Sequence, residues 1–150
     1  MSNVTVLNDL IEINNDRVAG FEKAVSDIKD ENIDLKEIFL GYASQSRQFA
    51  QELSAEVGKL GGDVETDNSV SGTLHRAWID IKALFTGGDR TSILNEAERG
   101  EDAIKAAYQN ALSAENLSLE HRELIKAQAQ KINDGHDAIK ALRDLARKAD

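Results

Sequence analysis

The stretch ILNEAERGEDAIKAAY, from Ile93 to Tyr108, decides the fold, because it carries an apolar stripe interrupted by an acid. If the stretch is helical, residues three and four apart share one face. That face carries Leu94, Ala97, Glu101, Ile104, Tyr108 and Ala111. Glu98 lies one turn before Glu101 on nearly the same side. Burying a bare carboxylate costs too much free energy, so Glu101 must be paired, hydrogen-bonded, protonated or bound to metal.

Helical periodicity continues on both sides of this stretch and is broken at glycine-rich connections. Gly61 and Gly62 follow one long apolar stripe, and Gly87 and Gly88 precede another. The segments with helical spacing are residues 4–29, 33–60, 69–85, 90–113 and 118–148. Two long helices, a connection with a short helix, and two more long helices are typical of a four-helix bundle with one long crossover. We therefore predict an all-α fold in which residues 1–150 form a single domain.

Composition and charge exclude several classes of protein. The chain has no cysteine, which excludes disulfides, thiolate metal sites and cysteine nucleophiles. Its 27 acidic and 18 basic residues give a net charge of -9, which repels nucleic acid. The sequence has neither a signal-peptide pattern at its start nor an apolar run long enough to cross a bilayer. We expect a cytoplasmic protein that binds neither nucleic acid nor a membrane.

Polar residues interrupt all four long stripes at similar heights in the expected bundle. The interrupting residues are Asn14, Ser46, Glu101, Asn133 and His136. Di-metal carboxylate bundles place single glutamates on two helices and Glu-x-x-His on the other two at this level. Only Glu101 and His136 remain as good ligands here, with Glu98 as a possible third. The candidate metal ligands are therefore Glu98, Glu101 and His136.

A buried ion pair is the alternative explanation for these acids. Arg47 follows Ser46 on the facing helix, and its guanidinium can hold Glu98 or Glu101 through two hydrogen bonds. A core histidine bonded to Asn14 or to a backbone carbonyl would likewise explain His136. On the crossover, structural anchoring is sufficient to explain His75, Arg76 and Trp78.

Three motifs resemble a bacterial family of ferritin-like four-helix-bundle proteins of unknown function. They are Leu60-Gly61-Gly62, Gly72-x-x-His75-Arg76-x-Trp78 and Glu98-x-Gly100-Glu101-Asp102, within a resemblance that covers about residues 4–115. The resemblance implies a ferritin-like fold and does not imply an activity. The wider superfamily includes di-iron ferroxidases, rubrerythrins and mini-ferritins. Ser46 and Phe49 depart from its Glu-x-x-His pattern, which argues against ferroxidase chemistry.

Two functions follow as hypotheses. The first is a non-catalytic ferritin-like bundle without a cofactor, acting through self-association, such as a dimer, or a protein partner, for example in a stress response. The alternative is a metal-binding protein with a mononuclear or degenerate di-iron site for iron or another divalent metal. A mini-ferritin-like DNA protector is disfavoured by the acidic charge. The sequence has no serine–histidine–acid order, phosphate loop or zinc spacing that would support a hydrolase or nucleotide-binding protein.

Overall fold

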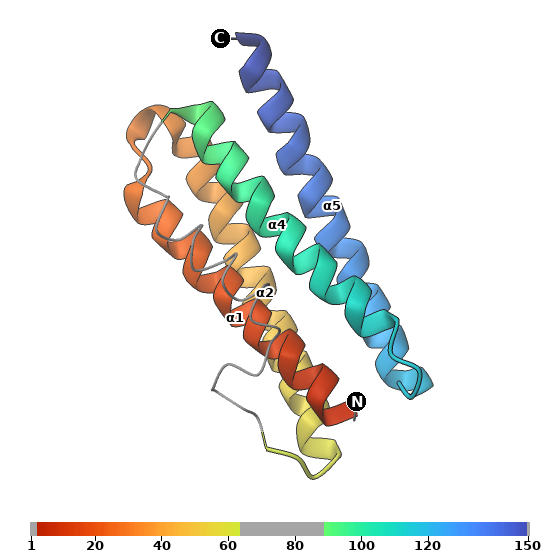
Figure 1. Ribbon diagram of the computed structural model, residues 1–150. Coiled ribbons are helices and arrows are strands. Elements are labelled where there is room, and N and C mark those ends of the chain that lie inside the picture. Colours follow the sequence, from red (N-terminus) through yellow and green to blue (C-terminus); the bar gives the residue numbers. More distant parts are fainter. Residues whose placement is uncertain (1–2, 64–88, 150) are drawn as a thin grey trace.

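Helices form nearly all of the computed structural model, which describes residues 3–63 and 89–149. In those two ranges there are four long helices and no strand, which confirms the predicted all-α bundle (Figure 1). The helices are α1 (Asn3–Asp27), α2 (Ile33–Lys59), α4 (Arg90–Leu112) and α5 (Leu119–Ala149), with a short 3-10 turn, η1 (Asp30–Asn32), before α2. The expected crossover helix at 69–85, with His75, Arg76 and Trp78, lies outside the described residues.

The helices form two hairpins that pack against each other. α1 and α2 run antiparallel through the tight connection that contains η1, and α4 and α5 run antiparallel through residues 113–118 (Figure 1). The start of α1 meets the α4–α5 connection, where Asn3 Nδ2 donates to the carbonyl of Asn116 at 3.2 Å. Asn3 Oδ1 accepts from the backbone N–H of Ser118 at 3.1 Å. These bonds join the first helix to the beginning of the last.

Local sequence signals explain where the helices begin and end. Asp89 caps α4, because its Oδ1 accepts a hydrogen bond from the backbone N–H of Ser92 at 2.8 Å. After α2, Gly61 adopts a φ of 73°, a left-handed conformation that glycine reaches without steric cost. Arg90, the first residue of α4, forms two hydrogen bonds with Asp34 of α2, at 2.9 and 2.7 Å. The second hairpin is thereby fixed to the start of α2.

The core runs the length of the bundle and receives apolar side chains from every helix. Fully buried members include Leu7, Phe21, Phe39, Leu53, Leu94, Ile104, Ile125, Ile132 and Ile139. Towards the α1–α2 connection, the ring of Phe21 packs against those of Phe39 and Tyr42, with centroid distances of 4.9 and 5.6 Å. None of the described helices is both long and apolar enough to span a membrane. The bundle therefore has a continuous apolar interior in which any polar group must find a partner.

Candidate functional site

An ion pair between Arg17 of α1 and Glu101 of α4 lies at the centre of the bundle. Both side chains are fully buried. The guanidinium Nε donates to Glu101 Oε1 and Nη2 donates to Oε2, each at 2.8 Å. Such a two-pronged contact uses both carboxylate oxygens and compensates for the loss of water around two charges. Glu101 is thus buried and paired, one of the four states expected from its place in the stripe.

The remaining polar atoms of Arg17 face α2. Its Nη1 donates to Gln45 Oε1 at 2.8 Å and to Ser46 Oγ at 3.0 Å. The guanidinium also lies over the rings of Phe21 and Tyr42, at 5.6 and 5.1 Å from their centroids. A planar cation that donates at its edge and stacks through its faces is well suited to this enclosed position. Arg17 therefore connects three helices in one layer.

The fourth helix approaches this layer through a glycine. A Cβ atom added to Gly135 of α5 would meet Tyr42 Cε1 at 3.2 Å, Glu101 Oε2 at 3.3 Å and Arg17 Nη2 at 3.4 Å. The first two spacings are shorter than ordinary van der Waals contacts. The backbone of α5 is therefore pressed directly against the ion pair, and only a residue without a side chain fits there without movement of its neighbours.

The expectation that Arg47 holds Glu98 or Glu101 is wrong. Arg47 points away from the core and pairs with Glu22 on the surface, where both side chains are about half exposed. One residue along a helix corresponds to about 100° of rotation, so a neighbour of the buried Ser46 faces a different direction. The inner position belongs to Arg17, which follows Asn14 by three residues and precedes Phe21 by four, within the same apolar face of α1.

A second buried polar chain crosses the bundle nearer the α4–α5 connection. Asn14 Nδ2 donates to Tyr108 Oη at 2.9 Å, and Tyr108 Oη donates to Gln128 Oε1 at 2.6 Å. Gln128 Nε2 then donates to Glu52 Oε1 at 3.0 Å. Burial raises the pKa of the Tyr108 phenol well above its ordinary value, so the hydroxyl remains a donor. The four residues come from α1, α4, α5 and α2, so this chain of hydrogen bonds reaches each of the four described long helices. The buried Oδ1 of Asn14 accepts no hydrogen bond from the described residues.

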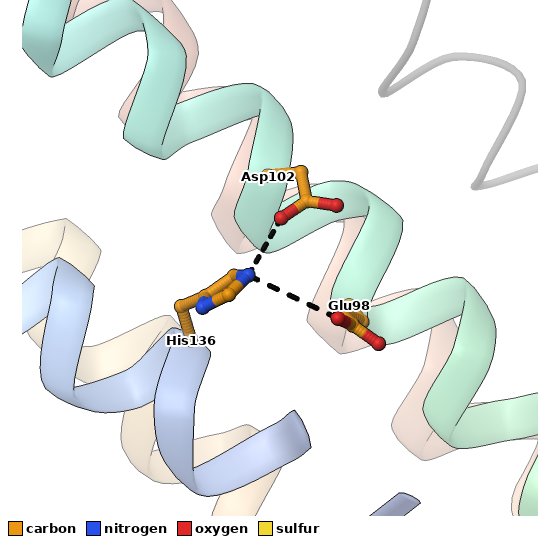
Figure 2. A group of neighbouring side chains, drawn as sticks. All are labelled: Glu98, Asp102 and His136. Atoms are coloured by element: carbon orange, nitrogen blue, oxygen red, sulfur yellow. Dashed lines mark hydrogen bonds and ion pairs between the residues drawn. The ribbon is translucent and has the colours of Figure 1, made fainter.

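Three potential metal ligands meet on the outer side of the α4–α5 contact (Figure 2). His136 Nε2 lies 2.6 Å from Asp102 Oδ1 and 4.0 Å from Glu98 Oε1. One ligand atom from each of the three residues lies within 4.8 Å of the other two. Glu98 and Asp102 are one helical turn apart on α4, and His136 reaches them from α5. The arrangement could hold one cation or a protonated histidine.

Two further charges border this group. Arg143, two turns after His136 on α5, forms an ion pair with Glu98 Oε2. Asp137 Oδ1 lies 3.2 Å from His136 Nδ1, the other ring nitrogen. Glu98 and His136 therefore have partners that fix their positions from outside the group, whereas the partner of Asp102 is His136 itself.

The structure brings together only part of the predicted metal set. Glu98 and His136 meet, whereas Glu101 turns into the core and is taken by Arg17. Asp102 occupies the third position. Apolar periodicity does not select Asp102, because residue 102 lies about 100° from residue 101 around the helix and therefore off the core-facing stripe. The i, i+4 spacing of Glu98 and Asp102 was the available signal.

The core layer does not fit a di-iron centre. Arg17 places a positive charge where the cations would lie and uses both oxygens of Glu101. Ser46 accepts a hydrogen bond from Arg17, and Asn133 is only partly buried on α5. Two metal ions need several anionic ligands, which this layer lacks. No step of iron chemistry follows from these residues.

Comparison with known proteins identifies a family whose description assigns no activity. The family model described as Domain of unknown function (DUF2383) matches residues 2–114. No curated protein matches the chain. The matched range includes α1, α2 and α4 and ends before α5.

Proposed function

This chain belongs to the DUF2383 family, a domain of unknown function, and we propose that it is a non-catalytic ferritin-like bundle that acts through protein association. The observation that carries this proposal is the fully buried pair between Arg17 and Glu101. It fills the level at which carboxylate bundles hold their catalytic metals. The order of the helices supports the ferritin-like assignment, since a long connection between α2 and α4 separates two antiparallel hairpins.

Exposed apolar side chains support the association. Leu60, directly after α2, is 46% exposed, and Leu119, the first residue of α5, is 74% exposed. Lys59 Nζ and Glu120 Oε1, on residues next to these leucines, lie 4.0 Å apart, so both leucines belong to one end of the bundle. Large apolar side chains exposed together favour contact with another protein surface. A second copy of this chain is the simplest partner.

Iron titration tests the non-catalytic part of the proposal. Protein purified without a metal-affinity tag and treated with a chelator would receive ferrous iron in air. We expect fewer than two irons per chain and no oxidation above the rate in buffer, because the core carboxylate is already paired. Two irons per chain, with rapid oxidation that Glu101→Ala abolishes, would contradict the proposal.

Sedimentation tests the association. We expect wild-type protein to form a concentration-dependent oligomer and the double variant Leu60→Ser, Leu119→Ser to shift toward the monomer. Leu40→Ser is the matched control, because Leu40 is similarly exposed, at 48%, on another part of α2. A wild-type monomer at all concentrations that also retains no protein partner would refute this part.

A further inference from the structure

We propose that Glu98, Asp102 and His136 form a binding site for one divalent transition-metal ion on the outer face of the α4–α5 contact (Figure 2). The site is separate from the core layer and goes beyond the proposed non-catalytic function. Its ligands differ from the set expected from the sequence, because Asp102 replaces Glu101. Two helices supply the ligands, so a bound ion would cross-link them.

The distances require only small movements of side chains. Two atoms that bind the same ion lie about 3–3.4 Å apart when each metal–ligand bond is about 2.1 Å. The Nε2 atom of His136 lies 2.6 Å from Asp102 Oδ1 and 4.0 Å from Glu98 Oε1. Asp102 must move slightly outward, and its side chain is 59% exposed and free to do so. Glu98 must approach by a similar amount.

The histidine ring is oriented for coordination through Nε2. Asp137 Oδ1, 3.2 Å from Nδ1, is placed to accept the proton of that nitrogen. Without a metal, the 2.6 Å contact between Nε2 and Asp102 Oδ1 requires a proton between these two atoms, and a bound cation would replace that proton. With the ring proton on Nδ1, the Nε2 lone pair is directed at the two carboxylates and is available to a cation between them. Carboxylates that accept from the second nitrogen of a ligating histidine are a common feature of metal sites. Asp137 is therefore a positioning residue in this site.

Charge and ligand type indicate which ions fit. The acids Glu98, Asp102 and Asp137 carry three negative charges, and the one positive charge of Arg143 is shared between Glu98 and Asp144. The carboxylates around the site therefore exceed Arg143 by at least two negative charges. This excess balances one divalent cation. An imidazole nitrogen with carboxylate oxygens suits zinc, cobalt, iron or manganese better than magnesium or calcium. The exposed side at Asp102 leaves room for water to complete the coordination shell.

The competing explanation is a protonated His136 that bridges the two acids without metal. Adding Co²⁺ alone to the chelator-treated full chain, followed by calorimetry, separates the two. We expect saturation at one ion per chain, with affinity reduced about tenfold or more in Asp102→Asn and in His136→Gln. Asp134→Asn is the matched control, because Asp134 is an exposed acid of α5 that bonds Gln130. Its affinity should equal that of wild type.

Absence of saturable binding, or equal affinity in wild type, Asp102→Asn and His136→Gln, would overturn the proposal. The exposed position of Asp102 keeps the test valid even if replacement of His136 perturbs folding. Failure here would leave the non-catalytic proposal intact, since that proposal depends on iron stoichiometry and on Glu101.

Replacement of Arg143 provides a second test, in which the affinity for Co²⁺ should rise. The ion pair of Arg143 holds Glu98 Oε2 and places a positive charge beside the incoming cation. Arg143→Gln should therefore strengthen Co²⁺ binding several-fold. Arg147→Gln is the control, because Arg147 lies one turn further along α5 and bonds Asn95 instead. An unchanged or weaker affinity in Arg143→Gln would overturn the role of Glu98 as a ligand.

Discussion

Single residues carry unequal shares of stability, and the contrast between Arg17 and Arg47 illustrates this. Arg17→Met leaves Glu101 buried and unpaired, so we expect a loss of about 3–5 kcal/mol in the free energy of unfolding. Arg47→Met breaks a half-exposed pair with Glu22, so we expect a change of about 0–1 kcal/mol. Urea denaturation of both variants measures the difference. Equal midpoints would show that the core pair contributes no more than a surface pair.

Gly135 tests the close approach of α5 to the core pair. Alanine normally stabilises a helix interior, but here its Cβ would press on Tyr42, Glu101 and Arg17. The ion pair holds Arg17 and Glu101 in place, and the ring of Tyr42 packs against Phe21 and Arg17. We expect Gly135→Ala to lower stability by about 1–2 kcal/mol. Gly41→Ala on α2 is the control, since nothing lies within 4 Å of its added Cβ, and it should raise stability by about 0.5–1 kcal/mol. A stabilised Gly135→Ala would disprove the close contact.

At the scale of elements, α5 is integral to the bundle although the family match ends at residue 114. It contributes Ile125, Ile132 and Ile139 to the core, all fully buried. A chain that ends at Ser113 would leave the facing apolar side chains open to water. We expect it to be aggregated or molten, with lost near-ultraviolet circular dichroism and binding of a hydrophobic dye. Sharp, dispersed NMR spectra from this truncation would contradict that view.

The elements were more predictable from sequence than the site. Apolar periodicity and glycine breaks placed the four long helices, because burial of one face depends on spacing alone. The same pattern located the polar layer at Glu101. The same spacing favours Arg17 over Arg47 as the partner of Glu101, because Arg17 lies three residues after Asn14 and four before Phe21, whereas Arg47 lies one residue off the inner face of α2. Asp102 lies off the core-facing stripe. Which residues meet across helices also depends on packing that periodicity does not encode.

For the whole molecule, acid should weaken folding through its depressed carboxylates. The hydrogen bond from Arg90 lowers the pKa of Asp34 below its usual 3.8, and the hydrogen bond from Lys59 lowers that of Glu56 below 4.5. A depressed folded-state pKa adds stability above the unfolded value, and this is lost as pH falls through the folded pKa. We expect the free energy of unfolding to decline below about pH 4.

Asp34→Asn should make this acid-induced decline shallower, because it removes one of the groups whose protonation opposes folding. Asp30→Asn is the control, because Asp30 is an exposed acid of η1 that lies four residues before Asp34. Denaturation midpoints measured between neutral and acidic pH would provide the comparison. A decline of the same steepness in wild type and Asp34→Asn would show that the pair with Arg90 has no role in acid stability.

The buried pair of Arg17 and Glu101 also restricts how this protein can evolve. Loss of either charge alone leaves the other charge buried and unpaired, which destabilises the fold. Replacement of both by apolar residues can leave the stability of the fold unchanged or increase it. Either single substitution therefore destabilises the fold, so the two positions are expected to change almost together. Across the family, positions 17 and 101 should covary as an acid–base couple or an apolar couple. A residue larger than glycine is expected at position 135 only where the side chains at positions 17 and 101 are smaller.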